Sequence, residues 1–173
     1  PDADTDVYPD DESRPSRTGL SRSSGLEGMK NHMDLKIVLE PLNVENWLKV
    51  CRLSVSDAQK EIFSVPNVYW IGISRYEEHS ELFAVRAGEE YVGLIGARYD
   101  EETDAGQINP FMIDQHHQKK GFGRAALLAM IAWMRENYGV FRIDISNRAA
   151  NTVAGKLYES LGFRIHKREG TEE

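Results

Sequence analysis

A basic, glycine-containing loop that runs directly into a long helix constrains this sequence more than any other feature. The loop at residues 114–123 reads DQHHQKKGFG, follows the apolar residues 111–113, and precedes a run of good helix formers at residues 124–138. Gly139 suits the end of that helix. The order of strand, glycine loop and helix predicts a mixed fold in which helices cover a sheet.

The composition of the loop predicts an anion site. The first turn of a helix exposes unpaired backbone N–H groups and a partial positive charge. Gly121 and Gly123 remove side chains that would keep an anion from the backbone, and full charges lie beside them at Lys119, Lys120 and Arg124. A pyrophosphate fits this combination. The simpler alternative is a tight turn whose lysines are solvated.

The spacing of the glycines excludes the commoner nucleotide loops, since neither GxxxxGK[ST] nor GxGxxG occurs. Residues 118–123, QKKGFG, instead resemble the [Q/R]xxGx[G/A] signature of the GNAT family of N-acetyltransferases. Residues 151–163, NTVAGKLYESLGF, are similar to a second segment of that family, N-x-x-A-x-x-L-Y-E-x-L-G-F. The two motifs occur in the family's order, and the resemblance covers residues 35–167.

The resemblance implies an α/β fold of the α+β type. Its centre is a mixed, mostly antiparallel sheet of six or seven strands, in which the fourth and fifth strands splay apart, flanked by about four helices. Pro110 cannot donate to a sheet ladder, so it predicts a bulge or an unpaired edge in the fourth strand. The residue pattern predicts strands at residues 35–42, 81–100 (a hairpin) and 105–114, and helices at residues 43–55, 68–79 and 124–138. The resemblance implies a fifth strand at residues 141–146 and a helix at residues 147–160.

The same resemblance implies acetyl-coenzyme A as the cosubstrate. Its pyrophosphate would lie on the glycine loop, and its pantetheine arm would pair with the fourth strand. Asn151 can donate and accept hydrogen bonds and resembles a family residue that contacts this arm. The implied cofactor-binding residues are Phe111, Met112, Ile113, Gln118, Lys119, Lys120, Gly121, Phe122, Gly123, Arg124, Asn151 and Tyr158.

Tyr158 resembles the family's general acid, which protonates the departing thiolate; the alternative is a packing role beside Leu157 and Leu161. At pH 7 only about 0.04% of an alkyl amine is neutral, so the site must help to remove a proton. Family members often use a carboxylate near the fourth strand, but Gln107 and Asn109 stand there and neither is a base. An acidic turn precedes them and either relays a proton or is simply solvated; it holds Asp100, Glu101, Glu102 and Asp104.

Residues 45–78 indicate the acceptor, because they resemble the segment that walls the acceptor pocket in bacterial spermidine and spermine acetyltransferases. Aromatic faces and carboxylates suit a polyamine. That branch carries W-x-D-R where residues 107–110 read QINP, which removes an acid and an arginine. We expect spermidine or spermine, with an aminoglycoside, an amino acid or a protein N-terminus as alternatives. The candidate acceptor-binding residues are Tyr69, Trp70, Tyr76, Glu77, Glu78, Gln107 and Asn109.

Composition narrows the class of protein. The net charge of −7 opposes general affinity for nucleic acid and favours a cationic small molecule. Cys51 is the single cysteine, and the adjacent His116 and His117 lack helical ligand spacing, so we expect no disulfide and no metal. No window is apolar enough to span a bilayer and no signal peptide opens the chain, which favours a cytoplasmic protein without membrane contact. The resemblance also implies a homodimer. A rival class is an acyl-coenzyme A sensor or scaffold with little activity.

Residues 1–33 differ in composition from the rest of the chain. They are rich in Pro, Asp, Ser, Arg and Gly and carry almost no periodic apolar residues. Such a segment cannot bury enough surface to offset its chain entropy. We therefore expect a disordered or foreign tail at residues 1–33 and a single GNAT domain at residues 34–173.

Overall fold

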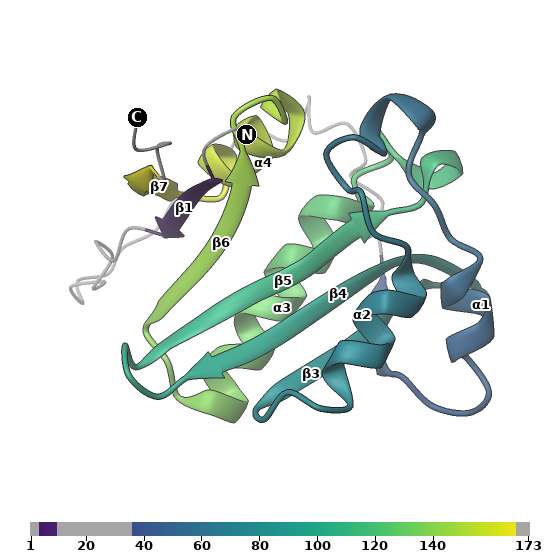
Figure 1. Ribbon diagram of the computed structural model, residues 1–173, viewed down its shortest axis with the longest axis horizontal. Helices are drawn as coiled ribbons and strands as arrows, with labels where there is room; N and C mark the ends of the chain where they lie inside the picture. The colour runs from purple at the N-terminus through teal and green to yellow at the C-terminus, as the bar shows by residue number, and fades with distance from the viewer. Residues whose placement is uncertain (1–3, 10–35, 169–173) are drawn as a thin grey trace, which may run out of the picture.

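One seven-stranded sheet organises the residues that the computed structural model describes, which are 4–9 and 36–168 (Figure 1). The strand order is β2-β3-β4-β5-β6-β1-β7, and all neighbours are antiparallel except β5 and β6. The expected mixed, mostly antiparallel sheet is thereby confirmed. The strands are β1 (Asp4–Pro9), β2 (Ile37–Pro41), β3 (Ser80–Ala87), β4 (Glu90–Asp100), β5 (Ala105–Ile113), β6 (Arg142–Arg148) and β7 (Phe163–Arg168).

Helices cover both faces of the sheet (Figure 1). The alternation along β3 shows why: Leu82 and Ala84 belong to one apolar core, and Phe83 and Val85 belong to the other. The first core is covered by α1 (Trp47–Cys51) and α2 (Asn67–Ser74), and the second by α3 (Phe122–Tyr138) and α4 (Thr152–Ser160). Two short 3₁₀ turns, η1 (Asp57–Gln59) and η2 (Gln115–His117), complete the order.

The longest helix, α3, follows the sequence pattern closely. Its buried residues recur at helical spacing and face the sheet, and they are Ala126, Leu127, Met130, Ile131 and Met134. Gly121 and Gly139 flank the helix in the left-handed conformation. The expected helix at residues 124–138 is therefore confirmed, with its start two residues earlier.

A bulge interrupts the pairing of β4 with β5 at the predicted proline. The register shifts between Ile95 and Ala97, opposite Asn109 and Pro110. A Cβ atom on Gly96 would collide with the carbonyl oxygen of Asn109 and lie 2.8 Å from Cδ of Pro110. The close approach of the two backbones therefore requires glycine at position 96.

Three boundaries differ from the expectation. The helix expected at residues 68–79 is α2, which ends at Ser74. The first helix covers only Trp47–Cys51, because the Asn43 carboxamide accepts hydrogen bonds from the backbone N–H groups of Glu45 and Asn46 and holds a turn there. The strand β6 continues to Arg148, and α4 begins at Thr152 rather than at residue 147, since Asn151 caps it.

The strand β1 lies within the stretch for which we expected a tail. Asp4–Pro9 pairs with both β6 and β7, so these six residues belong to the sheet. The sequence DTDVYP contains β-favouring Thr, Val and Tyr, and strand pairing needs only backbone groups. The remainder of the expected tail lies outside the described residues.

No helix among the described residues has the length and apolar character needed to cross a bilayer.

The bulge gives a testable prediction about stability. Gly96→Ala should lower the free energy of unfolding by about 1–3 kcal/mol, because the new methyl group meets backbone that cannot move aside. Gly72→Ala is the matched control: Gly72 lies within α2 and an added Cβ has no heavy atom within 4 Å. In that variant the free energy of unfolding should rise by about 0.5–1 kcal/mol, because Ala has the higher helix propensity. Urea denaturation measures both changes, and equal effects would contradict the close approach.

Candidate functional site

The outer half of β5 has one unpaired edge. The strand pairs with β4 as far as Ile113, but its parallel pairing with β6 ends at Ile108 opposite Ile145. Beyond that point the two strands diverge, as Figure 1 shows. Residues 109–113 therefore present backbone groups to a gap between β5 and β6. The splayed strands expected from the sequence are these two.

The backbone groups that face the gap follow from strand alternation. The Asp114 N–H donates to Val92 O on β4 at 2.9 Å, so Met112 also directs its backbone toward β4. Phe111 and Ile113 consequently direct their N–H and C=O groups toward the gap. The Ile113 carbonyl accepts a hydrogen bond from Gln118 Nε2 at 2.9 Å. A ligand in the gap can therefore pair with β5 like an additional strand.

The glycine loop closes one end of this gap. Gly121 has φ +87° and Lys119 has φ +61°, so the loop turns sharply before α3 begins. The first hydrogen bond of the helix runs from Ala125 N–H to Gly121 O. The N–H groups of residues 122–124 consequently have no helical partner and remain available to an anion.

The three basic side chains of the loop have different environments. Lys120 Nζ donates to His116 O at 2.8 Å, and Arg124 donates to Ser160 O and Oγ at the end of α4. Lys119 is exposed and has no partner among the described residues. Lys120 and Arg124 thus also stabilise the loop itself, and of these three basic residues Lys119 alone makes no such contact among the described residues.

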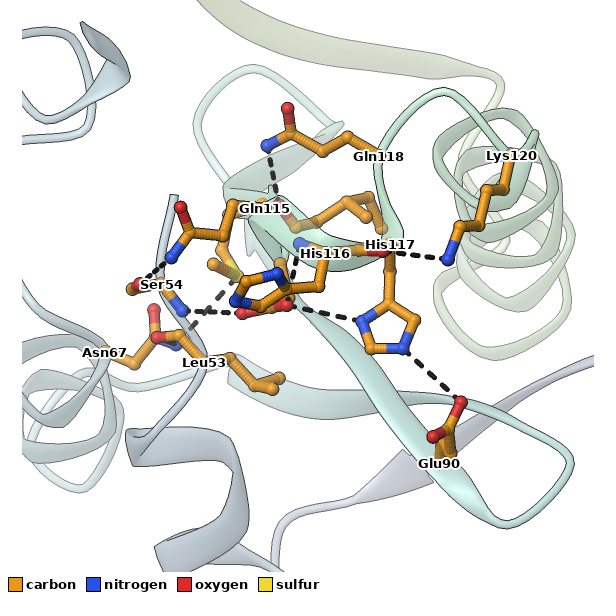
Figure 2. Close-up of polar contacts among 12 residues, drawn as sticks. Leu53, Ser54, Asn67, Glu90, Gln115, His116, His117, Gln118 and Lys120 are labelled. Atoms are coloured by element: carbon orange, nitrogen blue, oxygen red, sulfur yellow. Dashed lines mark hydrogen bonds and ion pairs between the residues drawn. The ribbon is translucent and has the colours of Figure 1, made fainter. Parts of the chain in front are cut away.

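Asp114 anchors the loop to the segment that follows α1, and the sequence reasoning missed it. Its carboxylate accepts hydrogen bonds from the backbone N–H groups of Ser54 (3.0 Å) and His116 (3.1 Å) and contacts Nδ1 of His117 at 3.3 Å (Figure 2). Burial raises the pKa of Asp114, but these hydrogen bonds outweigh burial and hold it below its usual value. An aspartate directly after a strand and before a turn was the available signal.

Further contacts join the same segment to the loop and to β6. Gln118 Nε2 donates to Gln59 Oε1 at 2.9 Å, and Gln115 N–H donates to Ser54 O at 2.9 Å. On the other side of the gap, Arg148 donates to Glu61 O at 2.9 Å. Residues 54–61 therefore hold both strand ends that border the gap.

Tyr158 lies on α4, next to the glycine loop, and Asn151 directly precedes that helix. An added Cβ on Gly123 would lie 3.4 Å from Leu157, which brings α4 against the start of α3. Tyr158 is 4% exposed, its hydroxyl has no hydrogen-bond partner among the described residues, and burial raises its pKa well above the ordinary value. It therefore remains protonated at neutral pH. Asn151 caps α4 by accepting from Ala154 N–H at 3.2 Å.

Part of the predicted acceptor site comes together beside the bulge. A small cavity of about 60 Å³ is lined by Trp70 and Glu77 on one side and Gln107 and Asn109 on the other. Tyr69, Tyr76 and Glu78 do not line it; Tyr76 is 92% exposed. Asp100 accepts from Gln107 Nε2 at 3.4 Å, and hydrogen bonds from Thr103 and the adjacent backbone hold its pKa below the usual value, which makes it a weak base.

A larger cavity of about 260 Å³ lies next to Met112 on β5. It is lined by residues 51–55, Lys60, residues 63–67 and Met112. Arg52 and Lys60 are its charged residues, and no carboxylate lines it. The sequence reasoning did not identify this cavity, because it forms only where residues 51–67 pack against Met112, which lies much later in the chain.

Two polar side-chain atoms with no exposed surface lack partners among the described residues: Asn67 Oδ1 and Trp70 Nε1. Each costs about 1–3 kcal/mol if it stays unpaired. Asn67 lines the larger cavity and Trp70 the smaller one. Within the described residues, no group of three or more His, Cys, Asp or Glu side chains is arranged to hold a metal.

Comparisons with known proteins agree with this geometry. The sequence model of the Acetyltransferase (GNAT) family matches residues 43–163. The chain is 37% identical over 70 residues to a "Probable spermine N(1)-acetyltransferase" of Bacillus subtilis subsp. natto (strain BEST195), covering 39% of this chain and 46% of that protein. It is 26% identical over 140 residues to the N-acetylaspartate synthetase of Xenopus tropicalis, and this match covers 80% of this chain and 45% of that protein. The chain therefore spans about half the length of these curated relatives.

A solved structure supports the fold. The spermidine N-acetyltransferase of Vibrio cholerae, in complex with CoA and spermine, superimposes with a TM-score of 0.61 at 17% identity, covering 76% of this chain and 89% of that one. At that identity the likeness concerns the fold alone.

The anchor at Asp114 predicts a pH-dependent loss of stability. Asp114→Asn should destabilise the protein by about 1–3 kcal/mol at pH 7, because its NH₂ group faces a backbone donor. The folded pKa is lowered, so this stabilisation is present above about pH 4 and is lost as the pH falls through the folded pKa. Denaturation from pH 7 to 3 should show that the difference in free energy of unfolding between the variant and wild type becomes smaller below about pH 4. Asp57→Asn, at an exposed ion pair, is the control. A difference that becomes larger in acid would contradict the assignment.

Proposed function

Because the chain belongs to the Acetyltransferase (GNAT) family, we propose that it transfers the acetyl group of acetyl-coenzyme A to a primary amine of a small molecule. One observation carries this proposal: the unpaired edge of β5 leads directly to the free N–H groups at the start of α3. The cytoplasmic location and the homodimer belong to the same proposal and rest on the family alone.

The residues present fit acetyl-coenzyme A. A pantetheine arm carries amide groups, which match the backbone groups of Phe111 and Ile113 in the gap. A pyrophosphate matches the N–H groups of residues 122–124 and the charge of Lys119. Asn151 borders the same region, although its Oδ1 also caps α4. The proposed binding residues are therefore those given by the two motifs.

The chemistry is direct acyl transfer. Acetyl-coenzyme A supplies the acetyl group as a thioester. The protonated amine first loses one proton to a base or to solvent. Its nitrogen then forms the new C–N bond as the C–S bond breaks, and loses a second proton. Tyr158, whose buried hydroxyl is protonated, donates its proton to the departing sulfur and takes one back from solvent, so coenzyme A leaves as the thiol. A backbone N–H of β5 polarises the acetyl oxygen.

The preferred acceptor is a polyamine such as spermidine or spermine. Glu77 and Trp70 both line the smaller cavity, together with Arg98, and a carboxylate and an aromatic ring suit a cationic amine. The relative named as a spermine acetyltransferase supports this choice. Glu77 is also the carboxylate of that cavity, so it is the candidate for attracting the amine and relaying its proton.

A carboxylate-bearing amine, such as an amino acid, is the second candidate. The larger cavity has Arg52 and Lys60 on its wall and no carboxylate, a charge pattern that favours an anionic group. Similarity to an N-acetylaspartate synthetase extends over 80% of the chain. The two candidates differ in the sign of the charge beside the reacting amine, so substrate panels separate them.

The proposed function is tested by thiol release from acetyl-coenzyme A in the presence of spermidine, spermine, aspartate, an aminoglycoside or a peptide. We expect turnover with at least one amine. Tyr158→Phe should lower kcat about 100-fold and leave the Kd of acetyl-coenzyme A unchanged. Tyr138→Phe, at a tyrosine near the far end of α3, is the matched control.

Two results would contradict the account separately. Full turnover by the Tyr158→Phe variant would remove the general-acid role of Tyr158. Tight cofactor binding by wild type without thiol release for any amine would favour the acyl-coenzyme A sensor.

A further inference from the structure

Among the described residues, the two fully buried side-chain polar atoms without partners lie on one helix face. Asn67 and Trp70 are one turn apart on α2, and both carry a buried polar atom without a hydrogen-bond partner. Side chains three positions apart lie on the same side of a helix. Asn67 is only 2% exposed. The two residues line different cavities, Asn67 the larger and Trp70 the smaller, so each buried atom needs its own partner.

The orientation of the Asn67 amide is fixed by its surroundings. Its Nδ2 donates to the backbone carbonyls of Val50 at 2.9 Å and Leu53 at 3.2 Å. Both of these partners are acceptors, so the NH₂ group must face them and the oxygen cannot. The same nitrogen lies 3.9 Å from Met112 Sδ. Oδ1 is thus the atom left over, and it requires a donor.

The position of Asn67 relates Oδ1 to the proposed reaction centre. Asn67 and Met112 both line the larger cavity, and Met112 lies between Phe111 and Ile113, whose backbone faces the gap. The contact of Asn67 Nδ2 with Met112 Sδ places the Asn67 side chain next to the strand along which the acetyl group is expected to lie.

We infer that Asn67 is an acceptor-binding residue whose Oδ1 receives a hydrogen bond from the N–H of the amine to be acetylated. The inference rests on the proposed function and deepens it. An amine donates in both its protonated and its neutral form, so the contact persists through the proton loss that precedes attack. Asn67 takes no proton; it holds the nitrogen beside β5. Because Asn67 lines the larger cavity, the inference places the reacting nitrogen of either acceptor there, and the smaller cavity is left for the rest of a polyamine.

The test compares Asn67→Ser with wild type, using the amine that gives the fastest thiol release. Ser can still donate to a backbone carbonyl but cannot present Oδ1 at the same place. We expect kcat/KM for the amine to fall about tenfold, with the Kd of acetyl-coenzyme A within about twofold of wild type. Asn137→Ser is the matched control, because Asn137 on α3 also donates its amide to a backbone carbonyl but is exposed.

A measurement on wild type covers the case in which the serine variant does not fold. In protein labelled with ¹³C and ¹⁵N at asparagine, the side-chain carbonyl signal of Asn67 should shift when the same amine is added in the presence of coenzyme A. An unshifted signal, or an unchanged kcat/KM in a folded variant, would overturn the inference while wild-type turnover leaves the proposed function intact. Absence of turnover in wild type would overturn both.

Discussion

The end of the pairing between β5 and β6 is the constraint on which the site depends. As far as Ile108 and Ile145 the backbones of the two strands pair with each other. Beyond that point the backbone groups on this edge of β5 have no partner on β6. Pro110 and the bulge opposite Gly96 occur where the pairing ends. A fully paired sheet would have no place for a ligand that binds as a strand, so the interruption creates the binding edge rather than weakening the fold.

An open strand edge is stable only if its neighbours are held in place. Residues 54–61 perform this task, because they bond to Asp114, Gln115 and Gln118 beyond β5 and to Arg148 at the end of β6. Asp114 is the central member, since one carboxylate serves two backbone N–H groups and a histidine. The segment that borders the proposed acceptor cavity is thus the segment that fixes the two sides of the gap.

Local patterns predicted the parts of the fold that depend on local chemistry. The apolar spacing of α3 and Pro110 on β5 indicated a helix and a bulge at the positions that the structure has. The glycine loop indicated where free N–H groups lie. Local patterns could not predict contacts between distant segments. The hydrogen bond from Gln118 to Gln59 joins residues 59 positions apart, and the pairing of β1 with β6 joins Asp4 to Arg148. Asn67 is buried through such contacts, so its unpaired oxygen had no local signal.

The acceptor residues show the same division. Trp70, Glu77, Gln107 and Asn109 were chosen by type and come together around one cavity, but Tyr76, chosen on the same grounds, points to solvent. Residue type indicates which side chains can bind an amine, and only the orientation of α2 over β5 decides which of them face it.

Hydrogen exchange at β5 tests the central claim most directly. Without ligand, the amides of Phe111 and Ile113 should exchange rapidly, whereas those of Met112 and Asp114, which bond to β4, should be protected. Saturating coenzyme A should protect Phe111 and Ile113. Protection of these two amides before coenzyme A is added, or continued rapid exchange at saturation, would contradict the account.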